Sequence, residues 1–379
     1  MSAARHNPHP NAWRLLAAAI HVAATFLSTP STHAQTIAPD DRRFPSAPFN
    51  EDVLAIPGDP ARPANLQVTL FTPLGPGPFP LAIMNHGATN ASATNRGDRY
   101  RFTVPAYYFL SRGYAVALPM MRGFAGSGGL LVHRACDLAS VARDNARDIR
   151  AVIDGLALRP EVDRTRIVVA GQSFGAWNTL GLAANPPSGI HGLIAFNAAL
   201  RASDCPWQDR AMAASAGQLA EHAVLPSLWF YGENDTIMPV ATWHAVFEAY
   251  TRLGSRAELV DFGSYKDDSH QLLSSPESLP LWAPKVDAFL ARVGMPSNLV
   301  SPGYLPHPAL PPTQFAALSD VSAVPFLNDA GKALYQRFLS ATKPRAFVIA
   351  PNGSASSSAS GYDPLGYALR GCARLAAGC

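Results

Sequence analysis

The sequence has few charged residues, few cysteines and no concentration of positive charge. Charged residues make up 15% of the 379 residues, the net charge is +3, and the basic residues form no long run. Such a composition lacks the basic footprint of nucleic-acid-binding proteins, so we expect no nucleic-acid partner. With 48% hydrophobic residues, the chain can instead bury a sizeable core in one large domain or two modest ones.

The N-terminal apolar run is too short to span a membrane, but it has the layout of a secretory signal. Residues 15–27 (LLAAAIHVAATFL) are apolar, whereas a spanning helix needs about 20 such residues. Basic residues precede the run, and the small residues Thr32 and Ala34 suit cleavage before Gln35. We therefore expect residues 1–34 to be a signal peptide, and the mature protein to be secreted or periplasmic with no stable membrane anchor.

Four cysteines follow this signal, at Cys136, Cys205, Cys372 and Cys379. Their spacing fits no zinc pattern, so we expect no metal site, and an even count in an exported protein favours disulfides. Cys372 and Cys379 are close enough in sequence to close a small loop, which would leave Cys136 and Cys205 to pair. The sequence does not fix this connectivity, and buried free thiols are the alternative.

Short apolar runs alternate with helical patterns through most of the chain. We expect strands at 66–72, 79–87, 114–119, 166–171, 191–196, 226–232 and 257–262. We expect helices at 103–113, 137–158, 242–254 and 282–294, and after Ser173. This alternation predicts an α/β fold with a mostly parallel sheet covered by helices on both faces. Functional residues should then lie beyond the carboxyl ends of the strands.

The composition changes near residue 296. We expect a catalytic domain over 35–295, opening with a lead that contains proline and aspartate. Residues 296–312 are proline-rich and aperiodic, as in a linker or a wrapping arm. Residues 313–379 form a small C-terminal α+β extension of unknown role, in which NGSASSSASG (352–361) is expected to be a flexible loop.

One serine stands between two glycines, with an expected strand before it and an expected helix after it. The stretch RIVVAGQSFGAWNTLGLAA (166–184) places Ser173 in the pattern G-x-S-x-G. In a nucleophile elbow, a sharp strand-to-helix turn lifts the serine off the sheet, and the glycines avoid clashes in that turn. The context favours a nucleophile over an ordinary turn serine, provided that the chain also supplies a base, an orienting acid and oxyanion donors.

The acid should come next along the chain, just after a later strand. The segment LWFYGENDTIMP places Asp235 in this position. Glu233 is the local alternative, although the residue next to a strand end often faces another way. Asp235 could also be only a helix cap or an Asx-turn residue. We expect Asp235 to be the acid of the site.

The base should be a histidine in a loop after the last strands. The segment DFGSYKDDSHQLL contains His270, with Asp267 and Asp268 beside it. These two carboxylates could compete as orienting acids, but adjacent loop carboxylates more often face solvent. His244 lies in an expected helix and His307 in the proline-rich segment, so His270 is the expected base.

The oxyanion hole should use two backbone N–H groups. One is expected from Phe174, the residue after the nucleophile, and the other from the turn that ends the strand in IMNHGATN. Ala88 is the expected second donor, and Gly87 lets the backbone approach closely. His86 is expected to support this turn rather than to act as the base.

The segment MRGFAGSGG (121–129) lies at the same expected edge of the sheet. Arg122 could line the pocket or tie down this loop through a salt bridge, and we favour the second role. Ser127 lacks the strand and helix of an elbow and is not expected to be a nucleophile. Three tryptophans are expected in the core rather than at the substrate: Trp177, Trp207 and Trp229.

Together these motifs resemble the α/β-hydrolase superfamily, and the chain is similar to its secreted or periplasmic dienelactone hydrolase-like members. The resemblance covers about residues 50–295 and rests on FPLAIMNHGAT, RGYAVALPMMRGFAGSGG, RIVVAGQSFGAWNTL, LWFYGENDTIMP and DDSHQLL. It implies an eight-stranded, mostly parallel sheet and a triad of Ser173, His270 and Asp235. Dienelactone hydrolases in the strict sense use a cysteine nucleophile, so the serine here removes the reason to expect a dienelactone substrate.

We therefore expect an exported serine hydrolase that cleaves small carboxylic esters through an acyl-enzyme, without a metal or an organic cofactor. A prolyl-oligopeptidase-like peptidase is the first alternative, although the lead before residue 66 is too short for a propeller domain. The second alternative is a catalytically silent binding protein with a hydrolase fold. The presence of Ser173, Asp235 and His270 in the expected order argues against it.

Overall fold

The computed structural model describes residues 35–37, 45–88, 99–311 and 317–378. The expected signal peptide and Cys379 lie outside these residues. None of the helices in the described part of the chain is long and apolar enough to cross a membrane.

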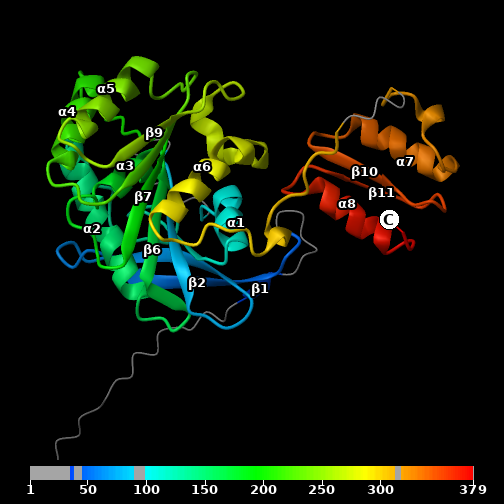
Figure 1. Cartoon of the computed structure of the whole chain (residues 1–379), viewed down its shortest axis with the longest axis horizontal. Coiled ribbons are helices and arrows are strands. Elements are labelled where there is room, and N and C mark those ends of the chain that lie inside the picture. Colours follow the sequence, from blue (N-terminus) through cyan, green and yellow to red (C-terminus); the bar gives the residue numbers. More distant parts are fainter. Residues whose placement is uncertain (1–34, 38–44, 89–98, 312–316, 379) are drawn as a thin grey trace, which may run out of the picture. The chain divides into compact units, whose positions relative to one another are not determined.

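Nine strands form one sheet in the described residues (Figure 1). In chain order they are β1 (Gln35–Ile37), β2 (Phe49–Pro57), β3 (Asn65–Pro73), β4 (Phe79–Asn85), β5 (Ala115–Pro119), β6 (Val162–Gln172), β7 (Ile190–Phe196), β8 (Ser227–Tyr231) and β9 (Ala257–Asp261). The spatial order is β1-β2-β3-β5-β4-β6-β7-β8-β9. Strands β4 to β9 pair in parallel, and the other neighbours pair antiparallel. The predicted eight-stranded, mostly parallel sheet is thus confirmed as β2–β9, and β1 adds a short edge strand.

Helices cover both faces of this sheet. They are α1 (Thr103–Ser111), α2 (Leu138–Leu156), α3 (Phe174–Leu180), α4 (Gln208–Ala220), α5 (Val240–Thr251) and α6 (Leu279–Arg292). Side chains alternate across each strand, so Leu81 and Ile83 join one core with α2–α5, and Ala82 joins a second core with α1 and α6. The central strands are apolar on both faces, as expected for a sheet buried between two helical layers.

Strand β2 was not among the expected strands, because it lies in the lead that contains proline and aspartate. Acidic residues are uncommon in strands, yet β2 contains Glu51 and Asp52. Glu51 is buried and forms ion pairs with Arg99 and Arg101, which compensate its carboxylate for the loss of water. The strand is therefore stabilised by partners about 50 residues away in sequence.

The proline-rich segment packs against the domain over part of its length. The N–H groups of Val300 and Ser301 both donate to the carbonyl of Ser111, at 2.9 and 3.0 Å. Tyr304 is buried, and its hydroxyl donates to the carbonyl of Pro48 at 2.9 Å. Over these residues the segment is a wrapping arm.

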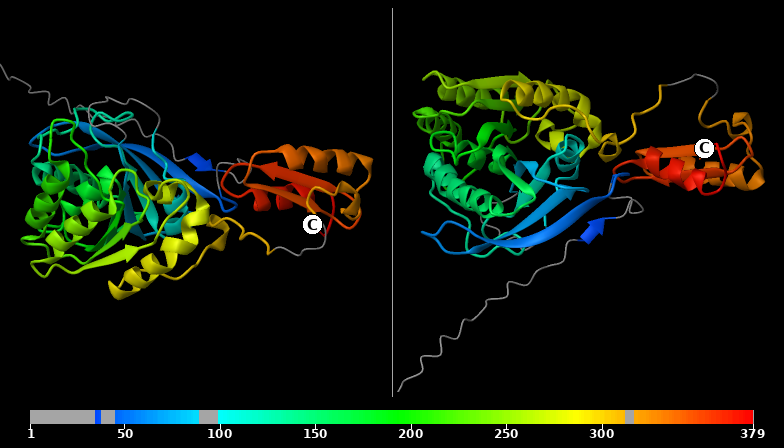
Figure 2. Two further views of the ribbon diagram at one scale, coloured as in Figure 1. Left: turned by 90° about the horizontal axis from the view of Figure 1, so that it is seen from above. Right: turned by 60° about the horizontal axis from the view of Figure 1, so that its bottom comes forward.

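Residues 329–373 contain α7 (Asp329–Ser340), β10 (Arg345–Ile349), β11 (Ala355–Ala359) and α8 (Pro364–Ala373). Figure 2 shows the β10–β11 hairpin with α7 and α8 beside it. The expectation of a flexible loop over NGSASSSASG is wrong, because its serine-rich centre is β11, paired antiparallel with β10. Gly353, with a φ of 85°, lies in the turn that allows this pairing.

Candidate active site

Ser173 lies in a tight turn between β6 and α3. Its φ and ψ are 55° and −122°, a strained conformation for a residue with a side chain. A Cβ atom on Gly175 would lie 2.3 Å from the carbonyl oxygen of Asn85, and one on Gly171 would lie 2.5 Å from the backbone of Gly175. The two glycines are therefore required by close backbone packing, which holds Ser173 at the carboxyl end of β6.

His270 lies next to Ser173 although the two residues are 97 positions apart in sequence. Its Nε2 atom is 2.9 Å from the Oγ atom of Ser173, and its Nδ1 atom is 2.9 Å from the Oδ2 atom of Asp235. The carboxylate can only accept, so Nδ1 carries the proton and Nε2 accepts from the serine hydroxyl. All three side chains are largely buried. The structure thus brings the three expected residues into one hydrogen-bonded chain.

Asp235 is held by three further donors. The N–H groups of Ile237 and Met238 donate to its Oδ1 atom, each at 2.8 Å. The side-chain amide of Asn197 donates to its Oδ2 atom at 2.9 Å. Asn197 directly follows β7 with a φ of 50° and is a residue of the site that was not predicted from the sequence. The feature that could have pointed to it is its place as a polar residue at the carboxyl end of an expected strand.

Two contacts hold the backbone of His270. The side-chain amide of Gln172, the residue before the serine, donates to the carbonyl of His270 at 3.2 Å. The Oδ1 atom of Asp268 accepts from the N–H of His270 at 2.9 Å. Asp268 also accepts from the N–H and hydroxyl of Thr236. It therefore fixes the loop that carries His270 instead of orienting the imidazole.

The other candidates for acid and base have different partners. Glu233 is exposed and accepts from the hydroxyl of Ser264 at 3.3 Å. His244 is exposed on α5 and stacks on Trp243. His307 pairs with Asp363 at 2.8 Å.

The turn after β4 places its backbone against Ser173. A Cβ atom on Gly87 would lie 3.1 Å from the Cβ atom of Ser173. Ala88 and Phe174 both line the pocket into which Ser173 opens. Phe174 is the first residue of α3, so its N–H has no acceptor within the helix and can serve another group.

His86 fixes the orientation of this turn. Its Nε2 atom lies 2.9 Å from the N–H nitrogen of Met121, which can only donate, so Nε2 must accept. The proton is then on Nδ1, which donates to the carbonyl of Gly87 at 2.7 Å. In a trans peptide the N–H points away from the carbonyl. The N–H of Ala88 therefore points away from His86.

Acidification is expected to destabilise the fold through His86. Burial lowers the pKa of His86 to about 4, whereas an unfolded chain has a histidine pKa of about 6.5. Between these values the unfolded state binds more protons, so the free energy of unfolding falls as the pH falls, by up to about 3 kcal/mol. Urea unfolding at several pH values should show this loss in the wild type. The loss should be smaller in His86→Gln, whose amide does not titrate. An equal pH dependence of stability in both proteins would show that His86 is not its cause.

The pocket above Ser173 has a volume of about 410 Å³. Its described walls come from segments that follow β4, β5, β6, β7, β8 and β9: Ala88, His133, Ser173, Phe174, Ala199, Leu200, Arg201, Ser203, Gln208, Ile237, Asp268, His270 and Gln271. Arg122 is not among them. It forms a buried, two-pronged ion pair with Asp148 on α2, at 2.5 and 2.7 Å, and so ties down the loop after β5.

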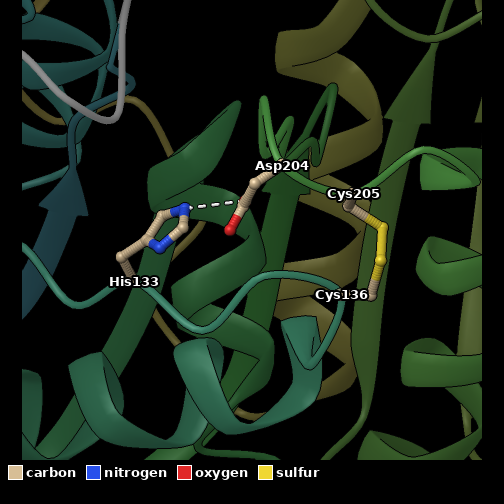
Figure 3. Close-up of a disulfide and its surroundings, with 4 residues drawn as sticks. All are labelled: His133, Cys136, Asp204 and Cys205. Carbon is tan, nitrogen blue, oxygen red and sulfur yellow. Dashed lines mark ion pairs between the residues drawn. A yellow bond between two sulfur atoms is a disulfide. The ribbon is translucent and has the colours of Figure 1, made fainter.

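A disulfide joins two walls of this pocket. Cys136 and Cys205 are bonded, with their Cα atoms 5.0 Å apart. Beside the disulfide, the Nε2 atom of His133 lies 3.0 Å from a carboxylate oxygen of Asp204 (Figure 3). The pairing of Cys136 with Cys205 is confirmed, whereas the second expected pair includes Cys379, which lies outside the described residues.

Removing this disulfide is expected to lower the stability of the fold. It closes a loop between cysteines 69 residues apart, and a crosslink of this kind typically contributes about 2–4 kcal/mol. The double variant Cys136→Ser/Cys205→Ser should therefore unfold at a lower denaturant concentration than the wild type. Reducing the wild type should give a shift at least as large, because it would also open the expected Cys372–Cys379 pair. An unchanged midpoint in the double variant would show that the disulfide between Cys136 and Cys205 contributes nothing to stability.

Comparisons with known proteins give one family match and many similar folds. Residues 63–236 match the family described as X-Pro dipeptidyl-peptidase (S15 family). This range includes Ser173 and Asp235, and His270 lies beyond it. Among curated proteins, none matches the chain significantly.

The similar solved structures include a putative dienelactone hydrolase from Klebsiella pneumoniae subsp. pneumoniae, 16% identical, with 65% of this chain and 98% of that chain covered and a TM-score of 0.45. An esterase from Pyrococcus furiosus is 19% identical over 70% of this chain and 99% of that chain, with a TM-score of 0.47. Esterase 2 from Thermogutta terrifontis, phosphorylated by paraoxon, is 19% identical over 65% of this chain and 96% of that chain, with a TM-score of 0.46.

Proposed function

We propose that this chain, a hydrolase with the α/β-hydrolase fold, is an exported serine esterase that cleaves small carboxylic esters. One observation carries the proposal: the hydroxyl of Ser173 lies 2.9 Å from Nε2 of His270, whose Nδ1 is held by Asp235. Ser173, at one end of these three hydrogen-bonded residues, opens into a pocket of about 410 Å³, which is large enough for a small substrate. A binding protein would not need this proton-transfer arrangement.

In the proposed reaction, His270 takes the proton of Ser173 as the serine oxygen attacks the ester carbonyl. The negative charge that develops on the carbonyl oxygen is stabilised by the N–H groups of Phe174 and Ala88. His270 then gives its proton to the leaving alcohol, which departs and leaves an acyl-enzyme on Ser173. A water molecule, deprotonated by His270, attacks the acyl-enzyme and releases the acid. Asp235 keeps the imidazole in the required tautomer throughout.

His86 supports this reaction without touching the substrate. Its hydrogen bond to the carbonyl of Gly87 holds the peptide whose N–H belongs to Ala88. The same ring stacks on Tyr100, with ring centres 4.8 Å apart, so it has little freedom to turn. His86 is therefore a positioning residue for the proposed oxyanion hole.

A peptidase is the second candidate, because the matching family is described as an X-Pro dipeptidyl-peptidase. A dipeptidyl-peptidase must recognise a free N-terminal ammonium group, for which a carboxylate is the usual partner. In the described part of the pocket the one carboxylate besides the proposed triad is Asp268, and in the adjoining groove Asp209 is paired with Arg201. Asp268 already accepts hydrogen bonds from Thr236 and His270. This favours an ester over a dipeptide unit.

Paired substrates test the proposal. The purified protein should hydrolyse short-chain nitrophenyl esters, and its kcat/KM for X-Pro nitroanilides should be at least about a hundredfold lower. The ratio matters because activated esters react readily with many serine hydrolases, so a matched amide is the control. A higher kcat/KM for the X-Pro amide would replace the esterase by a peptidase.

Export is the remaining part of the proposal. The disulfide between Cys136 and Cys205 supports it, since disulfides persist in oxidising compartments. Expression of the full chain with fractionation should recover a protein that begins at Gln35 outside the cytoplasm. Recovery of the uncleaved chain from the cytoplasm would contradict export.

A further inference from the structure

One tryptophan departs from the expected burial. Trp177, Trp229, Trp243 and Trp282 are fully buried, whereas Trp207 is 62% exposed. It is the one exposed tryptophan in the part of the chain that the structure describes. An exposed indole offers a flat apolar face on which a ligand can pack.

Trp207 lines a groove that adjoins the serine pocket. The groove has a volume of about 700 Å³. Arg201, Gln208 and Ile237 line both the groove and the pocket above Ser173. The groove and the pocket are therefore neighbours that share these side chains, and a substrate long enough to pass them would reach the groove. We call this region the Trp207 groove, and its other described lining residues are Pro206, Asp209, Arg210, Thr236 and Pro239.

The segment that carries Trp207 is held in place. Cys205, two residues before Trp207, is bonded to Cys136 (Figure 3). Asp204 is paired with His133, which lines the serine pocket. A backbone segment held in place before binding loses little conformational entropy when a ligand arrives.

Three of the polar residues around Trp207 are engaged in contacts with the protein. Arg201 pairs with Asp209 at 2.5 Å and also donates to the carbonyl of Ile237 at 3.0 Å. The hydroxyl of Thr236 donates to Asp268. The surface that these contacts leave is mixed: Trp207, Pro206, Ile237 and Pro239 supply its apolar part, and Gln208 and Arg210 supply polar groups. Within it, the exposed indole face of Trp207 is a flat apolar surface on which an aromatic ring can stack.

We infer that the Trp207 groove binds an aromatic ring carried by the ester substrate, at a distance from the reacting carbonyl. The inference rests on the proposed function, since it assumes that the carbonyl is held at Ser173. Stacking on Trp207 would then favour aryl-substituted esters over alkyl esters of equal length.

Matched esters test the inference. Methyl esters of phenyl-terminated and alkyl-terminated acids, and acetates of the corresponding alcohols, are compared by pH-stat titration, so that no chromophore adds a ring. The wild type should prefer the phenyl member of at least one series. Trp207→Ala should lower kcat/KM for that ester about tenfold, mainly through KM, and change methyl acetate less than twofold. Trp207→Phe should restore most of the preference.

Leu253→Ala is the matched control, because Leu253 is also 62% exposed and does not line the groove. It should leave both series unchanged. Equal loss on phenyl and alkyl esters in Trp207→Ala, or no loss on either, would overturn the inference while leaving the esterase intact.

A binding measurement separates this inference from the proposed function. In Ser173→Ala, titration with the phenyl ester should change tryptophan fluorescence, and the change should be absent in Ser173→Ala/Trp207→Ala. The same fluorescence difference in a protein that hydrolyses no ester would keep the ring site and overturn the esterase. If the two variants give the same fluorescence and the wild type hydrolyses esters, the ring site is overturned and the esterase stands.

Discussion

Replacing Ser173 by alanine is expected to lower kcat for a short ester by about 10⁴–10⁶-fold. The variant retains the oxyanion donors and the pocket but has no oxygen that can attack the carbonyl, so only background hydrolysis remains. Alanine tolerates the φ of 55° at this position about as well as serine does, so the fold should persist. Initial rates and a thermal melt of both proteins give the comparison.

Ser274→Ala is the matched control, because Ser274 is an exposed serine on the segment after His270 and bonds only to the carbonyl of Gln271 among the described contacts. Its rate should stay within twofold of the wild type. If Ser173→Ala keeps more than a few per cent of the wild-type rate, another group is the nucleophile.

Asp235→Asn should cost about 10⁴-fold in kcat with little change in KM. The amide of the new side chain can donate to Nδ1 of His270, which favours the tautomer with its proton on Nε2. That nitrogen then cannot accept the proton of Ser173. The N–H groups of Ile237 and Met238 can still bond to the amide oxygen, so the loop geometry is retained.

Glu233→Gln distinguishes the two acids of the ENDTIMP segment. Glu233 is exposed and contacts Ser264, so its replacement should change the rate less than twofold. The opposite pattern, with Glu233→Gln impaired and Asp235→Asn active, would transfer the role to Glu233.

The order of the site along the chain could be predicted because each part has a local signal. Ser173 is marked by its two glycines, and Asp235 and His270 each follow a short apolar strand. Parallel strands bring their carboxyl ends to one edge of the sheet, so residues that follow different strands meet there although they are far apart in sequence. The elements themselves were predictable for the same reason, since buried parallel strands are nearly continuous apolar runs.

Features that depend on distant partners could not be predicted. Strand β2 contains a glutamate that is stable there only because Arg99 and Arg101 reach it. Strand β11 is a serine-rich segment that needs β10 beside it. Asn197 bonds to Asp235 from 38 residues away.

Trp207 was expected in the core because tryptophan is more often a core residue than a substrate contact, and the expectation is wrong. Local pattern did not separate it from Trp177, which is fully buried on α3. Its exposure follows from its place at the start of α4, just after the disulfide that joins Cys205 to the segment after β5. Substrate specificity, which depends on such loops, is the part of the function that sequence patterns predict least.

Reaction with a fluorophosphonate probe shows whether Ser173 is the nucleophile. Such a probe forms a stable bond with a serine whose hydroxyl is activated by a neighbouring base. Peptide mapping by mass spectrometry should find a single adduct on Ser173 in the wild type, greatly reduced in Asp235→Asn and absent in Ser173→Ala. An unmodified Ser173 in a protein that hydrolyses esters, or equal labelling of the wild type and Ser173→Ala, would contradict the account.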